Sequence, residues 1–152
     1  MIKNLGKLCL TLCLLVVGGG VVANAQMDSV PQIEVNVTFP FMVGDTKLPA
    51  GKYVIKTSDD ESPNVLELRS ADTKTSVIFD TENAQTRGDK TVNKTELVFD
   101  KVGDQYFLSQ IWVEGSATGN ELVKSRMEKR LLAGNSQAEK HSVVASMKRM
   151  KP

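Results

Sequence analysis

Residues 33–43 read Ile-Glu-Val-Asn-Val-Thr-Phe-Pro-Phe-Met-Val, and this stretch decides the fold. Its odd-numbered positions are all apolar, whereas its even-numbered positions carry Glu, Asn, Thr, Pro and Met. A period of two over eleven residues is typical of a strand with one buried face. Pro40 falls in the outward set and has no N–H for a ladder, so we expect an edge or a bulge at that point.

Shorter alternating segments follow, each bounded by turn residues. They lie at residues 46–48, 52–57, 65–70, 75–80, 95–101 and 106–113, and residues 81–94 read as a polar loop. Turns recur at roughly 8–12-residue intervals, as they do in antiparallel sandwiches and barrels. The sequence therefore predicts a mainly β fold, an antiparallel sandwich or half-barrel meander of about six or seven strands.

Turn chemistry and burial suggest which residues have structural roles. Two Val-Gly-Asp segments, at residues 43–45 and 102–104, suit tight turns because glycine tolerates positive φ. Residues 48–51, Leu-Pro-Ala-Gly, match a type I turn. We expect seven residues to be structural: Gly44, Asp45, Pro49 and Gly51 at turns, and Tyr53, Phe107 and Trp112 in the core.

The segment at residues 106–113 is apolar on both sides. Strict alternation puts Tyr106, Leu108 and Trp112 on one face and Phe107, Ile111 and Val113 on the other. A strand with two apolar faces is usually central in its sheet or covered by another element.

The C-terminal third predicts a helix and then a tail. Asn120 is a good N-cap, and Leu122, Val123, Met127, Leu131 and Leu132 recur at helical spacing. We expect an amphipathic helix over residues 120–133 that covers an open end or face of the β domain. Residues 134–152 are basic and are predicted to be a flexible tail, with a second helix over 137–150 as the alternative.

The first 25 residues read as a signal peptide. Lys3 and Lys7 precede an apolar stretch over residues 8–17, three glycines follow, and residues 23–25 form an Ala-Asn-Ala cleavage signal. A membrane anchor is the alternative, but the apolar run is short and broken by glycine. Cleavage after Ala25 would leave a polar leader at 26–32 and the β domain at 33–133, exported to the periplasm or the medium.

Cysteine usage and charge restrict the possible chemistry. Both cysteines, Cys9 and Cys13, lie in the signal peptide, so the processed chain would have no disulfide and no cysteine nucleophile. Residues 26–119 carry a net charge of −6 and residues 120–152 a net charge of +5. The basic tail could bind the acidic body, bind an envelope component or other anionic surface, or remain solvated. An acidic β body disfavours nucleic-acid binding.

Candidate chemical motifs are weak. His141 is the single histidine and has no neighbouring ligand in the sequence, and residues 59–61 (Asp-Asp-Glu) lack the spacing of a Ca²⁺ loop. The Arg-Gly-Asp tripeptide at 87–89 reads as an ordinary polar turn. We assign no catalytic, cofactor-binding or metal-ligating residue, and we expect no cofactor and no transmembrane segment after processing.

Three segments together resemble a known group of proteins. They are residues 39–53, which contain Val-Gly-Asp-x-x-Leu-Pro-Ala-Gly-x-Tyr, residues 103–112 with their Gly-Asp-Gln-Tyr-Phe-Leu, and residues 121–126. The chain is similar to uncharacterised small exported β-domain proteins typical of acidobacteria-like bacteria. The resemblance implies export and a β-rich domain, but no activity and no functional residues.

The function expected from the sequence is a non-enzymatic binding or structural module of the cell envelope or extracellular space. The first alternative is a carrier of a small apolar ligand or lipid, with the ligand in a β-barrel cavity. The second is an enzyme of unknown type, which would need catalytic groups that the sequence does not reveal.

Overall fold

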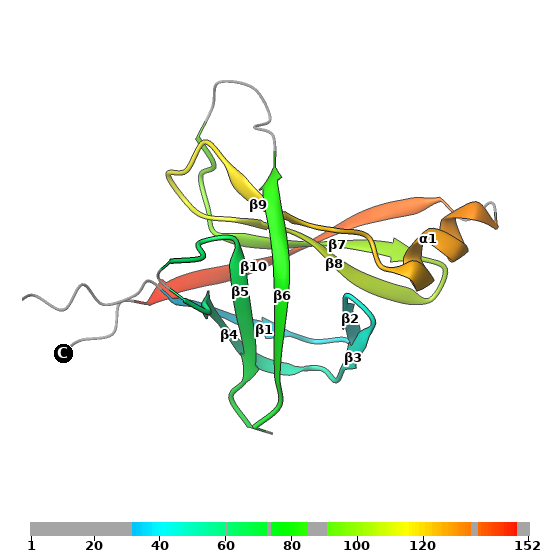
Figure 1. Cartoon of the computed structure of the whole chain (residues 1–152), viewed down its shortest axis with the longest axis horizontal. Helices are drawn as coiled ribbons and strands as arrows, with labels where there is room; N and C mark the ends of the chain where they lie inside the picture. Colours follow the sequence, from blue (N-terminus) through cyan, green and yellow to red (C-terminus); the bar gives the residue numbers. More distant parts are fainter. Residues whose placement is uncertain (1–31, 60, 73, 85–90, 135–136, 149–152) are drawn as a thin grey trace, which may run out of the picture.

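The computed structural model describes residues 32–59, 61–72, 74–84, 91–134 and 137–148. The predicted signal peptide, nearly all of the polar leader and the Arg-Gly-Asp tripeptide lie outside these residues. The described chain forms ten strands and one helix (Figure 1). The strands are β1 Gln32–Val37, β2 Phe41–Val43, β3 Thr46–Leu48, β4 Gly51–Thr57, β5 Val65–Ser70, β6 Ser76–Ala84, β7 Glu96–Val102, β8 Gln105–Trp112, β9 Gly119–Leu122 and β10 Ala138–Lys148, and the helix is α1 Arg126–Ala133.

Eight of these strands close into an antiparallel barrel. The order around the ring is β1-β4-β5-β6-β9-β8-β7-β10, and β10 pairs with β1 to complete it. The β2–β3 hairpin attaches to β8 through one parallel pair, Met42 with Phe107. The predicted mainly β, antiparallel architecture is confirmed, and the sheet is closed. Closure leaves few exposed edges for another chain to pair with.

The barrel interior contains the residues that the alternation predicted. Ile33, Val35, Val37, Phe41 and Val43 belong to one buried cluster, and each is at most 8% exposed. The cluster is completed by Leu48, Tyr53, Ile55, Leu66, Leu68, Leu97, Phe99, Leu108, Ile111 and Leu122. Side chains therefore fill the interior, as is common for eight-stranded barrels.

The strand predicted over residues 33–43 is divided into β1 and β2. Pro40 lies between them, and the chain bends at Phe39. This break matches the expected irregularity at Pro40, because proline cannot donate to a ladder. The odd-numbered side chains remain on the inner side in both strands.

Two of the predicted turn glycines have positive φ. Gly44 has φ 58° and Gly103 has φ 61°, and each is the first residue of a two-residue hairpin turn, where glycine is preferred in type II′ turns. Gly51 differs, because it begins β4 without positive φ, and an added Cβ would lie 3.7 Å from Cε2 of Tyr53. The backbone therefore requires glycine at 44 and 103 more than at 51.

A bulge in β8 changes which side chains face inward. Val98 pairs with Gln110 and Phe99 with Leu108, so Ser109 is an extra residue in β8. Beyond it, Ile111 faces the interior, whereas Trp112 packs on the outer side. The predicted grouping of Trp112 with Leu108 is therefore wrong, although Tyr53, Phe107 and Trp112 are all buried as expected.

The helix begins later than predicted. Residues 119–122 form β9, which closes the barrel between β6 and β8, and α1 begins after an N-cap at Ser125. Barrel closure decides the conformation here: Gly119 fits against Trp112 so closely that an added Cβ would lie 2.8 Å from its ring. The expected apolar face is only partly correct. Leu131 and Leu132 pack on a buried cluster as predicted, but Val123 and Met127 are exposed and Glu128 is buried.

The predicted flexible tail and its helical alternative are wrong for residues 138–148. They form β10, which lies between β1 and β7 and runs along the barrel in Figure 1. Two of its lysines pair with acids of the body, Lys140 with Asp100 and Lys148 with Glu34. Of the possibilities open for the basic segment, the structure shows binding to the body.

The polar loop expected at residues 81–94 is shorter than predicted. Residues 81–84 belong to β6, where they pair with β9. Asn120 of β9 donates a hydrogen bond from Nδ2 to Oγ1 of Thr81 at 3.0 Å. In this part of β6 only Thr81 and Ala84 are buried, and Glu82 and Asn83 are exposed. The segment therefore lacks the apolar alternation from which a strand is predicted.

Candidate functional site

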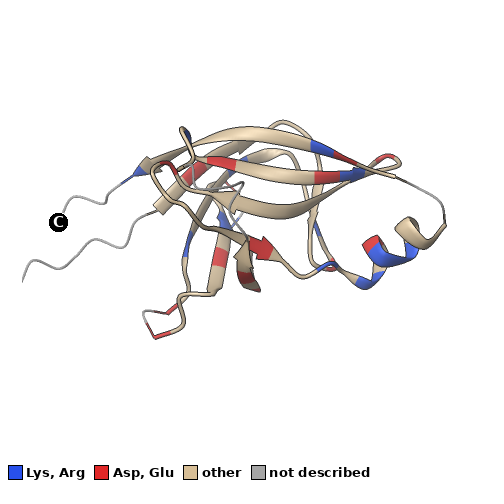
Figure 2. Cartoon of the chain, turned by 90° about the horizontal axis from the view of Figure 1, so that it is seen from above, with Lys and Arg blue, Asp and Glu red and all other residues tan. Residues whose placement is uncertain are grey.

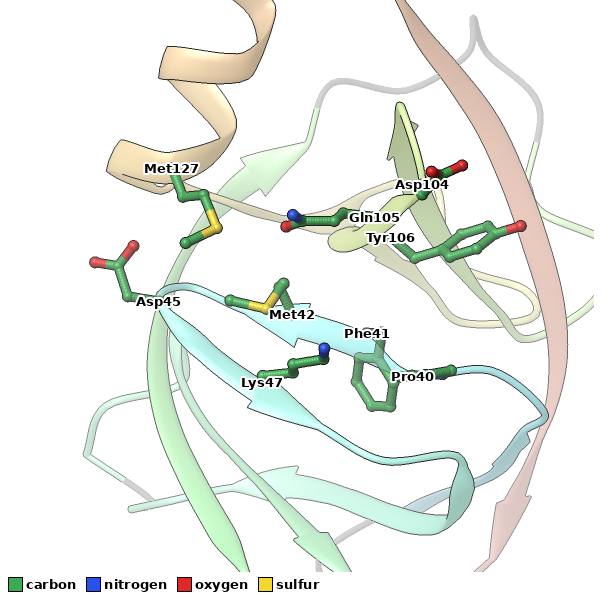
Figure 3. A pocket seen from close by; sticks show the side chains of 9 residues that line it. All are labelled: Pro40, Phe41, Met42, Asp45, Lys47, Asp104, Gln105, Tyr106 and Met127. Atoms are coloured by element: carbon green, nitrogen blue, oxygen red, sulfur yellow. The ribbon is translucent and has the colours of Figure 1, made fainter.

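A cleft of about 420 Å³ lies beside the helix at one end of the barrel (Figure 3). Its walls are the β2–β3 hairpin, the turn and first residues of β8, and the first turn of α1. The lining residues are Pro40, Phe41, Met42, Asp45, Lys47, Asp104, Gln105, Tyr106 and Met127. A volume in this range is typical of sites for small molecules.

The two Val-Gly-Asp turns meet at this cleft. The pairing of β2 with β8 brings the β2–β3 turn beside the β7–β8 turn, although some sixty residues separate them in the chain. The positive φ at Gly44 and Gly103 makes each turn tight and places Asp45 and Asp104 at the rim. In Figure 3 both carboxylates lie at the edges, turned away from the centre.

Two methionines approach each other across the cleft. Met42 comes from β2 and Met127 from α1, and Figure 3 shows their thioethers on opposite walls. Met42 is 6% exposed, whereas Met127 is 42% exposed, so the Met127 side chain is accessible to a ligand in the cleft. Methionine is flexible and polarisable, which makes it common at surfaces that adapt to varied apolar ligands.

Polar groups accompany the methionines. The side chain of Lys47 extends along the floor of the cleft near Phe41 and Met42, and the carboxamide of Gln105 points toward Met127 (Figure 3). Within the described part of the chain, the side chains of Lys47 and Gln105 form no ion pair and no hydrogen bond. An ammonium and an amide are thus available to a ligand over an apolar floor.

The position of α1 is set by its cap and by two leucines. Ser125 accepts a hydrogen bond at Oγ from the backbone N–H of Glu128 at 3.1 Å, a typical N-cap contact. Leu131 and Leu132 pack on a small buried cluster outside the barrel wall, formed by Met42, Val102 and Phe107. The helix is therefore anchored on the outer face rather than over the open end, with Met127 projecting at the cleft.

A buried charge network fixes the same region. Asp100 of β7 has a 1% exposed side chain and lies 2.7 Å from Nζ of Lys124 and 2.5 Å from Nζ of Lys140. Lys124 also bonds to the buried Glu128 at 2.8 Å. In Figure 2, acidic and basic residues appear both on α1 and on the strands at this end of the molecule. The network ties the approach to α1 and the start of β10 to the barrel wall.

The pKa values within the network reflect two opposing effects. Burial raises the pKa of Asp100, but hydrogen bonds and charges from Lys124 and Lys140 outweigh it and hold the pKa below its usual value. Burial lowers the pKa of Lys124, but the bonds to Asp100 and Glu128 outweigh it and raise the pKa. Both shifts favour the charged forms of Asp100 and Lys124.

His141 lies in an aromatic cluster near the cleft. Its ring is edge-on to Phe39 and Tyr106, with centroid distances of 5.2 and 5.6 Å, and Phe39 stacks on Tyr106 at 4.1 Å. No carboxylate among the residues that the structure describes forms an ion pair with His141. This geometry supports a packing role for the histidine.

The other sequence candidates lie elsewhere. Asp59 and Glu61 are exposed in the β4–β5 loop, and the Glu61 N–H donates to the Asp59 carboxylate at 3.1 Å, while residue 60 lies outside the described residues. Across the described ranges, no group of three His, Cys, Asp or Glu side chains could hold a metal ion. The one helix of these ranges is too short and too polar to cross a membrane.

No pattern in the sequence predicts the cleft. Met42 belongs to the outward set of the first strand, and Met127 was assigned to the apolar face of the helix, so nothing placed them opposite each other. One signal could have located α1: Ser125-Arg-Met-Glu128 is a capping-box sequence. The two Val-Gly-Asp turns were recognised in the sequence, but their proximity depends on the β2–β8 pairing.

Comparisons with protein-family models, with curated proteins and with solved structures return no match for this chain.

Proposed function

We propose that the chain is an exported, non-enzymatic binding module whose ligand is a small apolar or amphiphilic molecule held in the cleft beside α1. The single observation that carries this proposal is a cleft of about 420 Å³ with an exposed methionine on one wall and a second methionine facing it. Export is supported by the signal-peptide pattern of residues 1–25 and by the resemblance to exported β-domain proteins.

The position of the cleft favours a ligand on the surface of the barrel rather than inside it. The interior is filled by an apolar cluster whose largest members, Tyr53, Phe41 and Phe99, are at most 1% exposed. A lipid carrier with a central cavity would need that space empty. The cleft needs no empty space in the barrel interior, because its walls are the β2–β3 hairpin, the start of β8 and the first turn of α1.

Probe binding tests the proposal. The uncharged fluorophore N-phenyl-1-naphthylamine should bind the processed protein with increased, blue-shifted emission, because an apolar cleft excludes water from the dye. Met127→Gln should weaken binding about threefold to tenfold, as expected when part of a buried apolar side chain is replaced by a polar one. Circular dichroism and the urea midpoint would verify that the variant is folded.

Ile78→Gln is the matched control. Ile78 is 62% exposed on β6 and does not line the cleft, so the same type of replacement should leave dye affinity unchanged. Equal losses for the two variants, or a wild-type protein that does not bind the dye, would refute the cleft as the binding site.

A further inference from the structure

The cleft contains groups that discriminate between ligand headgroups. Lys47 places a positive charge along the floor, and Gln105 adds N–H donors on the opposite side (Figure 3). Neither side chain has a polar partner among the residues described. An anion bound between them would receive charge-assisted hydrogen bonds, which are about twice as strong as neutral ones.

Two carboxylates at the same cleft act against an anion. Asp45 and Asp104 are exposed at the turn tips, and in Figure 3 they lie at the rim with their oxygens directed away from the centre. Lys47 is exposed as well, so water and salt screen all three charges over about 8–10 Å, but Figure 3 shows the lysine side chain extending along the floor of the cleft. The group nearest to a ligand on that floor is therefore the ammonium.

The apolar part of the ligand is fixed by the methionines. Met42 and Met127 form facing walls, and Phe41 and Pro40 continue the apolar surface toward Tyr106. A straight alkyl or flat aromatic body fits between two flexible thioethers better than a rigid, highly branched one, because methionine adjusts its rotamers to the ligand.

We propose that the cleft selects amphiphiles with an anionic headgroup, carboxylate or phosphate, with the headgroup on Lys47 and Gln105 and the apolar body between Met42 and Met127. This inference rests on the proposed function, since it requires a ligand in the cleft. Carboxylate and phosphate share the chemistry that the ammonium recognises, and the experiment separates them.

Competition between four twelve-carbon amphiphiles tests the headgroup. Dodecanoate, dodecyl phosphate, dodecyltrimethylammonium and dodecyl maltoside would displace N-phenyl-1-naphthylamine at pH 7.5, each below its critical micelle concentration. At least one of the two anions should bind about tenfold more tightly than the cation and the maltoside. Raising the salt concentration should reduce that preference, since the headgroup lies near solvent.

Lys47→Gln identifies the residue responsible. The variant should lose the preference for anions, measured as the ratio of anion affinity to maltoside affinity within the same variant, and Lys47→Arg should keep it. Lys129→Gln is the matched control: Lys129 is an exposed cation of α1 outside the cleft lining, and its loss should leave the preference intact.

The outcomes separate the two proposals. If the wild-type protein does not bind the dye, the proposed function is wrong. If the dye binds but the headgroups compete equally, if the cation binds best, or if the anion preference persists in Lys47→Gln, only the headgroup inference is wrong. A tighter dodecyl phosphate indicates a phosphate-bearing ligand, and a tighter dodecanoate indicates a carboxylate-bearing one.

Discussion

The two faces of β7 show two different ways of stabilising one strand. On the inner face, Leu97 and Phe99 are completely buried among apolar side chains. On the outer face, Asp100 is equally buried, but its neighbours are the ammonium groups of Lys124 and Lys140. The inner face contributes hydrophobic free energy without directional demands, whereas the outer face requires specific partners from two later segments.

The difference shows what each face controls. Apolar burial makes the barrel stable, and similar side chains could replace one another with modest loss. A buried carboxylate contributes little net stability, but once buried it disfavours every arrangement in which its lysines are absent. The charge network thus determines where β10 and the approach to α1 dock, and through α1 the position of the cleft wall.

The largest expected loss of stability comes from a substitution on the inner face of β7. Phe99→Ala removes a ring that contacts Phe39 and Phe41 at centroid distances of 5.2 and 5.4 Å. The free energy of unfolding should fall by about 3–5 kcal/mol, the usual cost of deleting a buried phenyl group. Urea unfolding followed by circular dichroism measures it, and a loss below about 1 kcal/mol would contradict a packed interior.

Asp100→Asn should have the next largest effect, and it tests the outer face. The amide keeps the shape but leaves two lysines without their anion, and we expect a loss of about 2 kcal/mol. The lysine side chains are 39% and 51% exposed and can partly rehydrate, so the loss stays below that for a fully buried pair. Hydrogen exchange should also show faster opening of β10.

Lys148→Gln is the control for that variant. Lys148 forms an ion pair of 2.9 Å with Glu34, and the two side chains are 62% and 42% exposed. Its removal should change stability by no more than about 0.5 kcal/mol, as is typical of exposed pairs. Equal losses for Asp100→Asn and Lys148→Gln would mean that burial adds nothing to the network.

The capping contact of α1 should have a smaller effect. Ser125→Ala removes the acceptor for the Glu128 N–H, and the free energy of unfolding should fall by about 1 kcal/mol. Ser125→Asp should restore it, because aspartate is an equally good N-cap. If the alanine variant is as stable as wild type, the helix is held by Leu131 and Leu132 alone.

The smallest expected effect is the change in stability with pH that comes from Asp100. The pKa of Asp100 is lower in the folded chain than its unfolded value of about 3.9, so the folded state binds fewer protons in acid. The stability from Asp100 is present above that value and is lost as the pH falls through the lower folded pKa. The urea midpoints of wild type and Asp100→Asn should therefore converge between about pH 4 and pH 2. A constant difference over that range would argue against an ionised Asp100.

Sequence reasoning succeeded where one strong period dominates. The alternation over residues 33–43 identified the inner face of β1 and β2, because a strand with a single buried side leaves a clear pattern. It failed where tertiary pairing overrides local preference. Residues 119–122 have helical spacing with the segment that follows, yet they close the barrel as β9, and Gly119 is needed for the close approach to Trp112.

β10 was missed for a different reason. Val143 and Ala145 face the core, but both are only partly buried, and Val144 between them is 61% exposed. The apolar alternation is weak, and the strand is held mainly by backbone ladders and by the pair of Lys140 with the buried Asp100. The cleft was beyond prediction as well, since it depends on α1 standing beside the β2–β3 hairpin, a relation that no local pattern records.

The position of β10 also determines when the protein can fold. The first strand of the barrel pairs with the last, and the Glu34–Lys148 contact spans 114 residues of chain. The edges of β1 and β7 therefore stay unpaired until β10 has been synthesised. Such distant pairing folds slowly, and open edges invite aggregation. The barrel cannot close before β10 has been made, however early the other strands pair.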